Sequence, residues 1–80
     1  MNRHFLTPRE YEIYKLLIDN KTTSDIAILL GISEKTVRNH ISNVISKLGT
    51  KSRSQAIVIL LKNGIISIWC HFFYTIIIMN

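Results

Sequence analysis

Cysteine, proline and acidic residues are scarce in this chain. Its 80 residues include one cysteine, one proline, three glycines and five acids. A single cysteine excludes an internal disulfide and a zinc site built from several cysteines of one chain. It also points to a reducing compartment, so we expect a cytoplasmic, nucleoid-associated location. The length leaves room for one small domain.

The few charges are unevenly distributed. Ten lysines and arginines against five acids give a net charge of +5, and every acid lies at or before Glu34. This balance suits a polyanionic partner and favours nucleic acid over an acidic protein or a membrane surface. The chain begins without the apolar run of a secretory signal. The apolar stretch 65–79 is shorter than the ~20 residues of a membrane-spanning helix, so we do not expect it to span a membrane.

Capping residues divide the chain into four predicted helices, 8–19, 23–30, 34–48 and 53–63. The residues that cap their starts are Thr7, Thr22, Ser33 and Ser52. The reciprocal partners of capping boxes are Glu10, Asp25 and Gln55, and helix-stop glycines follow at Gly31, Gly49 and Gly64. The pattern predicts an all-α domain over residues 1–64. The glycine turn between the second and third helices is typical of a helix-turn-helix.

The helix predicted after Ser33 has two distinct faces. Its apolar residues share one stripe, formed by Val37, Ile41, Val44, Ile45 and Leu48. The opposite side holds Lys35, Thr36, Asn39, Ser42, Asn43 and Ser46, with Arg38, His40 and Lys47 on its flanks. Amide, hydroxyl and guanidinium groups of this kind hydrogen-bond base edges and phosphates. We therefore interpret this helix as one that presents side chains to the major groove of DNA.

The fourth predicted helix is apolar on all sides. We expect Ala56, Ile59 and Leu60 in the core, which leaves Ser54, Ile57, Val58 and Leu61 outside. A small isolated domain seldom leaves such a stripe in water. We therefore predict a homodimer interface at these four outer residues, with cover by the chain's own tail as the alternative.

The apolar tail, residues 65–80, is rich in β-branched and aromatic residues, whose intrinsic preference is extended as much as helical. It could continue the fourth helix, lie across the dimer surface, dock on another protein or dip into a membrane interface. Packing on this chain or on a partner is our interpretation. An incidental extension without a role is also open.

Residue patterns typical of enzymes or metal sites are not apparent. Neither His40 nor the pair Cys70–His71 has a second ligand at a metal-binding spacing. No carboxylate pair or nucleophile–base set is evident either. We therefore expect no enzymatic activity, no metal and no cofactor.

Five segments of the chain, in register, resemble the LuxR/FixJ/GerE-type DNA-binding domain. They read LTPRE, TSDIA, ISEKTVRNHIS, KLG and RSQA, and the similarity covers residues 4–66. It is greatest to members that consist of this domain alone, such as a small regulator of spore formation. The resemblance implies a four-helix domain of the winged-helix-like superfamily that binds a two-half-site promoter as a homodimer through its last helix. It further implies regulation of bacterial transcription, with RNA polymerase as a partner during activation.

The resemblance also implies roles for single residues. Those matching Arg38, Asn39 and Ser42 face base edges in family members. Those near phosphates match Thr22, Thr23, Lys35, Thr36, His40, Lys47, Lys51 and Arg53. The alternative for Arg38 and Asn39 is a merely solvated position on the helix exterior. A second function also remains open, namely a protein-interaction module that binds a partner through the apolar fourth helix and tail.

Overall fold

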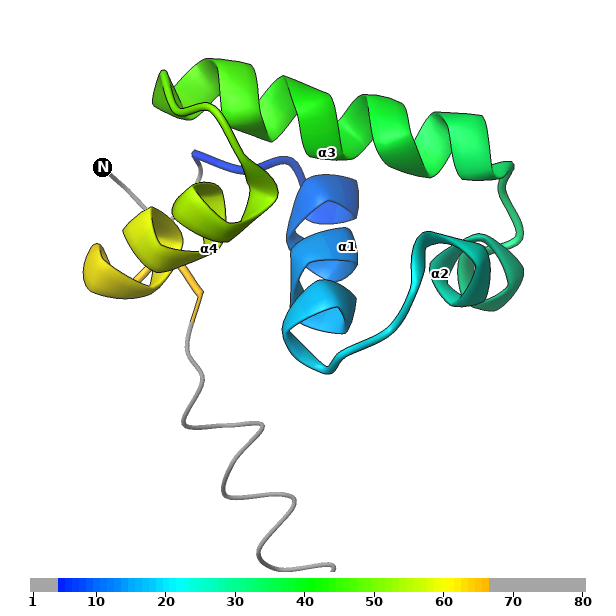
Figure 1. Cartoon of the computed structure of the whole chain (residues 1–80). Helices are drawn as coiled ribbons and strands as arrows, with labels where there is room; N and C mark the ends of the chain where they lie inside the picture. The colour runs from blue at the N-terminus through cyan, green and yellow to red at the C-terminus, as the bar shows by residue number, and fades with distance from the viewer. Residues whose placement is uncertain (1–4, 67–80) are drawn as a thin grey trace, which may run out of the picture.

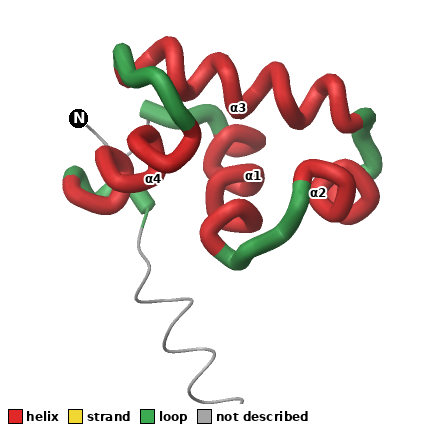
Figure 2. Tube along the Cα trace, viewed as in Figure 1, coloured by secondary structure: helices red, strands yellow, loops and turns green. Residues whose placement is uncertain are grey.

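A computed structural model describes residues 5–66, which form four helices and no strand. The helices are α1 (Pro8–Ile18), α2 (Thr23–Leu30), α3 (Glu34–Leu48) and α4 (Arg53–Lys62). Figures 1 and 2 show their arrangement. The all-α prediction is confirmed, and each predicted helix boundary agrees to within one residue. The interpretations of the tail beyond Ile66 fall outside the described residues.

Helix starts follow the predicted capping residues. At α1, Glu10 N–H donates to the Thr7 hydroxyl at 3.1 Å, and Thr7 N–H donates to the Glu10 carboxylate at 2.9 Å. Thr22 and Asp25 form the same reciprocal pair at α2, with both distances 3.1 Å. Gly31 ends α2 in the left-handed conformation at φ 68°, which a residue without a side chain adopts at little cost. Local sequence therefore sets these boundaries.

The start of α4 differs from the predicted capping box. Ser52 accepts the N–H of Gln55 at 3.2 Å, as expected. The Gln55 side chain was expected to bond back to Ser52, and that prediction is wrong. Its Oε1 accepts the N–H of Lys51 at 3.2 Å and the hydroxyl of Thr50. The glutamine thus closes the turn between α3 and α4.

The hydrophobic core lies under α3, which packs against each of the other three helices (Figure 1). The predicted inner stripe of α3 is confirmed, because Val37, Ile41 and Val44 are buried and Ile45 and Leu48 pack half-buried beside them. The other helices contribute the fully buried residues Ile13, Tyr14, Ile26, Ala56 and Leu60. This packing turns the polar side of α3 outward.

Tyr14 is a polar member of this core. Its ring is fully buried, and its hydroxyl donates to the backbone carbonyl of Ile41 at 3.0 Å. Burial raises the pKa of Tyr14 to about 12, against the effect of nearby Arg53 and with a small contribution from Glu10. The hydroxyl therefore keeps its proton and links α1 to the middle of α3.

A buried carboxylate links the start of α1 to the end of α3. Glu10 Oε1 lies 2.6 Å from Lys47 Nζ, and the Glu10 side chain is 4% exposed against 35% for Lys47. Lys47 also donates to the Phe5 carbonyl at 3.4 Å. Burial alone would raise the pKa of Glu10, but the hydrogen bonds from Lys47 and Thr7 outweigh it and hold the pKa below its ordinary value. Glu10 is therefore a charged group inside the fold.

α4 is turned relative to the predicted orientation. Ala56 and Leu60 are buried as expected, but Ile57 and Leu61, expected outside, are half-buried against the core. Ile59, expected inside, lines a surface hollow instead. At 100° per residue, the positions that follow Ala56 and Leu60 also turn toward the core. The outer face therefore consists of Ser54, Gln55, Val58 and Ile59.

The two ends of the described chain also join the core. Leu6 before α1 is buried, and Phe5 packs partly buried beside it. Ile65 and Ile66, which the sequence analysis assigned to the tail, are buried as well. The packed unit therefore runs through Ile66, two residues past the boundary predicted at 64. No helix within residues 5–66 is long and apolar enough to cross a membrane.

Replacing Tyr14 by phenylalanine removes the hydrogen bond to Ile41 and keeps the ring. We expect the free energy of unfolding to fall by about 1 kcal/mol, the net value of one such bond. Urea denaturation measures the loss. The matched control is Tyr11→Phe at an exposed ring on the same helix, where we expect a change below about 0.5 kcal/mol. Equal effects of the two variants would contradict a role for the Tyr14 hydroxyl.

Replacing Glu10 by glutamine removes the charge that Lys47 binds. Because the folded pKa of Glu10 is lowered, its stabilisation is fully present above the ordinary pKa of 4.5 and is lost as the pH falls through the folded pKa. We expect Glu10→Gln to lower the free energy of unfolding by about 1–3 kcal/mol at pH 7. Below about pH 5, the free energy of unfolding of this variant should change less with pH than that of the parent protein.

Urea titrations at pH 7 and at acid pH measure both effects. Glu12→Gln serves as control, since Glu12 forms an exposed pair with Arg9 at 3.2 Å. Exposed pairs of this kind contribute about 0–1 kcal/mol. Were Glu10→Gln to keep the full acid dependence of the parent protein, the Glu10–Lys47 pair would not be its source.

Candidate nucleic-acid interface

The side of α3 opposite the core is open to solvent along the helix. In Figure 1 the other three helices all lie on one side of α3, which leaves its far side uncovered. The exposed residues of that side are Lys35, Arg38, Asn39, Ser42, Asn43 and Ser46. We call this set the outer face of α3. It is polar throughout and carries two cations.

Arg38, Asn39 and Ser42, predicted to contact bases, lie together on the outer face. Asn39 follows Arg38 directly and Ser42 lies four residues after it, so the three side chains occupy adjacent turns on the same side of α3. All three are exposed. An α-helix with its side chains is ~10–12 Å wide. The major groove of B-DNA is ~12 Å wide and displays the acceptors and donors that such side chains recognise. The geometry is that of a helix able to enter the groove.

Helix starts meet at one end of the outer face. Thr22, the exposed N-cap of α2, and Thr23 beside it come close to the first turn of α3, because the Thr23 hydroxyl donates to Glu34 Oε1 at 3.2 Å. Lys35 is exposed there, whereas Thr36 is half-buried and shares a 2.9 Å hydrogen bond with the Ser33 hydroxyl. The structure thus brings together four of the predicted phosphate contacts. Free amides at helix starts favour phosphate binding.

The remaining predicted phosphate contacts lie on the flank of α3 and toward its other end. Lys51 and Arg53 are exposed in the turn to α4 and at its first residue, and His40 is half-buried on the flank of α3. Lys47 is the exception, because its ammonium group is held by Glu10 at 2.6 Å. The outer face therefore has candidate phosphate-binding groups at both ends.

Glu34 is part of this surface, although the sequence analysis gave it no role. Its Oε1 accepts from Arg38 Nη2 at 3.2 Å, with side-chain exposures of 44% for Glu34 and 60% for Arg38. The four-residue spacing of the two on a helix was a visible signal of this pair. The contact to Thr23 crosses the turn between helices and had no local signal.

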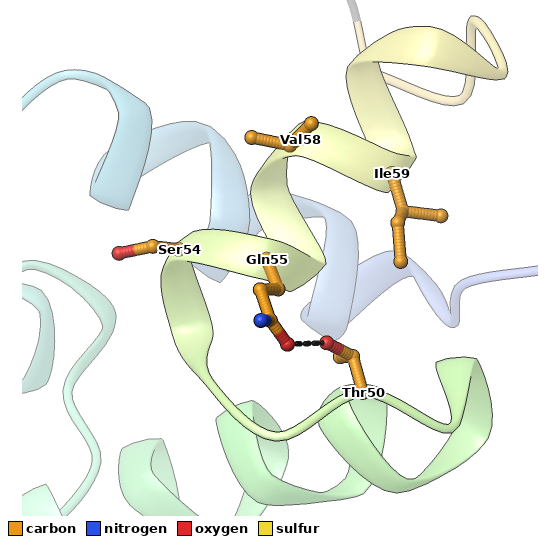
Figure 3. A pocket seen from close by; sticks show the side chains of 5 residues that line it. All are labelled: Thr50, Ser54, Gln55, Val58 and Ile59. Atoms are coloured by element: carbon orange, nitrogen blue, oxygen red, sulfur yellow. Dashed lines mark hydrogen bonds between the residues drawn. The ribbon is translucent and has the colours of Figure 1, made fainter.

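A separate apolar hollow lies on the outer face of α4. Figure 3 shows its lining residues, Thr50, Ser54, Gln55, Val58 and Ile59. The hollow has a volume of about 340 Å³. The Thr50–Gln55 hydrogen bond forms a polar edge, and Val58 is 49% exposed. Of the four residues predicted for a dimer interface, Ser54 and Val58 line this hollow, whereas Ile57 and Leu61 lie at the boundary with the core.

A further apolar surface, on α2, was not anticipated from the sequence. Ile28 and Leu29 are exposed and line a smaller hollow with Lys21 and Asp25. Within the described residues, no group of three or more metal-ligating side chains is placed to hold a metal ion. The features described on this surface are thus a polar helix face and apolar hollows on α2 and α4.

Comparison with known proteins gives consistent matches. Residues 4–60 match the family of bacterial regulatory proteins, luxR family. The chain is 59% identical over 63 residues to the spore germination protein GerE of Bacillus subtilis (strain 168), which covers 79% of this chain and 85% of that protein. It is 46% identical over 61 residues to the transcriptional regulatory protein DegU of Brevibacillus brevis, covering 76% of this chain and 26% of the relative.

A solved structure of the transcription factor GerE superposes with a TM-score of 0.77 at 60% sequence identity. The match covers 79% of this chain and 94% of that one. The resemblance on which the sequence analysis relied is thereby confirmed, as is the four-helix fold that it implied. This chain belongs to the luxR family of bacterial regulatory proteins and is a DNA-binding transcription regulator of the GerE type.

Proposed function

We propose that this regulator binds promoter DNA sequence-specifically as a homodimer, with one α3 helix in the major groove of each half-site. The observation that carries the proposal is the outer face of α3, where Arg38, Asn39 and Ser42 lie exposed on one side of the helix. RNA polymerase is the protein partner that the family resemblance implies for activation. GerE, the relative with 60% identity, is named as a transcription factor, which supports a role in transcription.

In this proposal the outer face of α3 supplies the base contacts, and Lys35 together with residues beside that face supplies the phosphate contacts. Arg38 donates to O6 and N7 of a guanine, and Asn39 pairs with an adenine in a similar two-bond manner. Ser42 reaches a neighbouring base edge. Residues at and beside the two ends of α3 hold the phosphates on either side of the groove, with His40 between them on the helix flank. At the start of α3 they are Thr22, Thr23, Lys35 and Thr36, and past its end they are Lys51 and Arg53. Lys47 can join them only by giving up its bond to Glu10. Such phosphate contacts position the helix without reading sequence.

The homodimer part of the proposal rests on α4. Its outer face exposes Val58, which lines a hollow of about 340 Å³ together with the half-buried Ile59, and apolar surface of this kind is stabilised by a partner. We propose that the α4 helices of two copies meet here, with Ser54 and Val58 central and Ile57 and Leu61 at the edges. Two-fold symmetry then presents two α3 helices to two half-sites about one helical turn apart.

Arg38→Ala tests base reading. We expect it to reduce the preference for a promoter site over scrambled DNA by about 1–3 kcal/mol, because the guanine loses a two-bond partner. Lys51→Ala is the matched phosphate variant, and we expect it to weaken binding to both DNAs alike. The slope of log affinity against log salt concentration should become shallower by about 0.9. Gel shifts over a series of salt concentrations measure both. Equal, weak binding of the parent protein to both DNAs would favour the interaction-module alternative.

Val58→Glu tests the dimer without altering the core, because Val58 is half exposed. We expect a monomer in sedimentation experiments and a loss of about tenfold or more in affinity for the complete site, since two linked half-sites bind far more tightly than one. Ile28→Glu places the same charge on the exposed face of α2 and should leave the dimer intact. If the parent protein is a monomer and still binds the complete site tightly, the interface on α4 is wrong.

A further inference from the structure

Glu34 places a negative charge within the proposed DNA surface. It is the last acid of the chain and the first residue of α3, and it stands directly before the exposed Lys35. A carboxylate here repels phosphates and so lowers affinity for DNA of every sequence. Attraction to a polyanion alone therefore does not explain a carboxylate at this position. Its contacts indicate another role.

The Glu34 carboxylate joins two residues with different proposed tasks. One oxygen, Oε1, accepts from Arg38 Nη2 at 3.2 Å and from the Thr23 hydroxyl at 3.2 Å. Arg38 is a proposed base contact one turn along α3, and Thr23 is a proposed phosphate contact at the start of α2. The contact to Thr23 restrains the carboxylate from outside its own helix. Glu34 is therefore held at a defined position relative to Arg38.

This pairing leaves Arg38 able to bind a base. A guanidinium group carries five N–H donors in a planar fork, and the bond to Glu34 uses one of them. The remaining donors suit the O6 and N7 acceptors of guanine. Since both side chains are well exposed to water, the pair is weak and restrains the arginine without locking it.

We propose that Glu34 is a positioning residue that determines specificity, because it holds Arg38 toward the base edges and away from neighbouring phosphates. The inference rests on the proposed function, in which α3 lies in the major groove. On non-specific DNA a free Arg38 turns to a phosphate and binds regardless of sequence. Glu34 opposes this by occupying a donor of the same fork and by repelling the phosphate. Sequence preference is gained at the expense of total affinity.

The experiment measures discrimination with the full-length chain. A preferred duplex is first selected from a random pool by the parent protein, and a scrambled duplex of equal composition serves for comparison. Glu34→Gln removes the charge and keeps an amide oxygen for Thr23. We expect scrambled DNA to be bound about threefold or more tightly, with a salt slope steeper by about 0.9 from one added phosphate contact. Affinity for the selected duplex should stay within about twofold, because the loss of phosphate repulsion is offset by the looser positioning of Arg38. The specificity ratio therefore falls.

Glu12→Gln is the matched control, because it changes the net charge equally on α1, where Glu12 pairs with Arg9. It should leave the specificity ratio unchanged. A second comparison places Glu34→Gln in an Arg38→Ala background, where the fall in ratio should vanish if the effect runs through Arg38. Urea denaturation of the variants separates discrimination from the helix stabilisation that an acid at a helix start provides.

Two results would overturn the inference. One is an equal effect of Glu34→Gln and Glu12→Gln on both duplexes. Glu34 would then act only through its contribution to the net charge of the protein. The other is an undiminished fall in the specificity ratio when Arg38 is already alanine. Failure of the proposed function gives a different result, because the parent protein then selects no preferred duplex at all.

Discussion

Burial of the inner stripe of α3 is the constraint on which the rest of the structure depends. Val37, Ile41 and Val44 meet residues from all three other helices, and the Tyr14 hydroxyl fixes α1 to the carbonyl of Ile41 at 3.0 Å. A helix rotates by 100° per residue, so a shift of one position would turn Arg38 toward the core. The side that reads DNA in our proposal is therefore defined by the side that is buried.

The acidic residues pair with only some of the bases, so positive charge remains at the two ends of α3. Glu10, Glu12 and Glu34 pair with Lys47, Arg9 and Arg38, and Asp19 lies 4.0 Å from Lys21. Across residues 5–66, the bases that form no ion pair are Lys15, Lys35, Lys51, Arg53 and Lys62. Three of these five are proposed phosphate contacts. The few acids thus leave cations at both ends of α3 without an ion pair, and two more on α1 and α4.

Capping chemistry made the helix boundaries predictable, because a residue such as Thr7 acts on amides within three positions of itself. The outer face of α3 was also predictable, because the apolar stripe and the polar residues of this helix lie on opposite sides. The rotation of α4 was not, because a helix that is apolar on all sides does not indicate which side is buried. The contacts of Tyr14 and Thr23 join residues 27 and 11 positions apart and depend on tertiary packing.

The turn between α3 and α4 shares a side chain with the hollow on α4. Gln55 lines that hollow while its Oε1 accepts from the Thr50 hydroxyl (Figure 3). The same oxygen also accepts from the backbone N–H of Lys51. A second copy seated on the hollow would shield these hydrogen bonds from water and stiffen the segment that carries Lys51. Subunit association and phosphate binding would then be thermodynamically linked, and linkage is reciprocal. In a dimer of the proposed kind, a phosphate bound at Lys51 would in turn tighten the contact between the two copies.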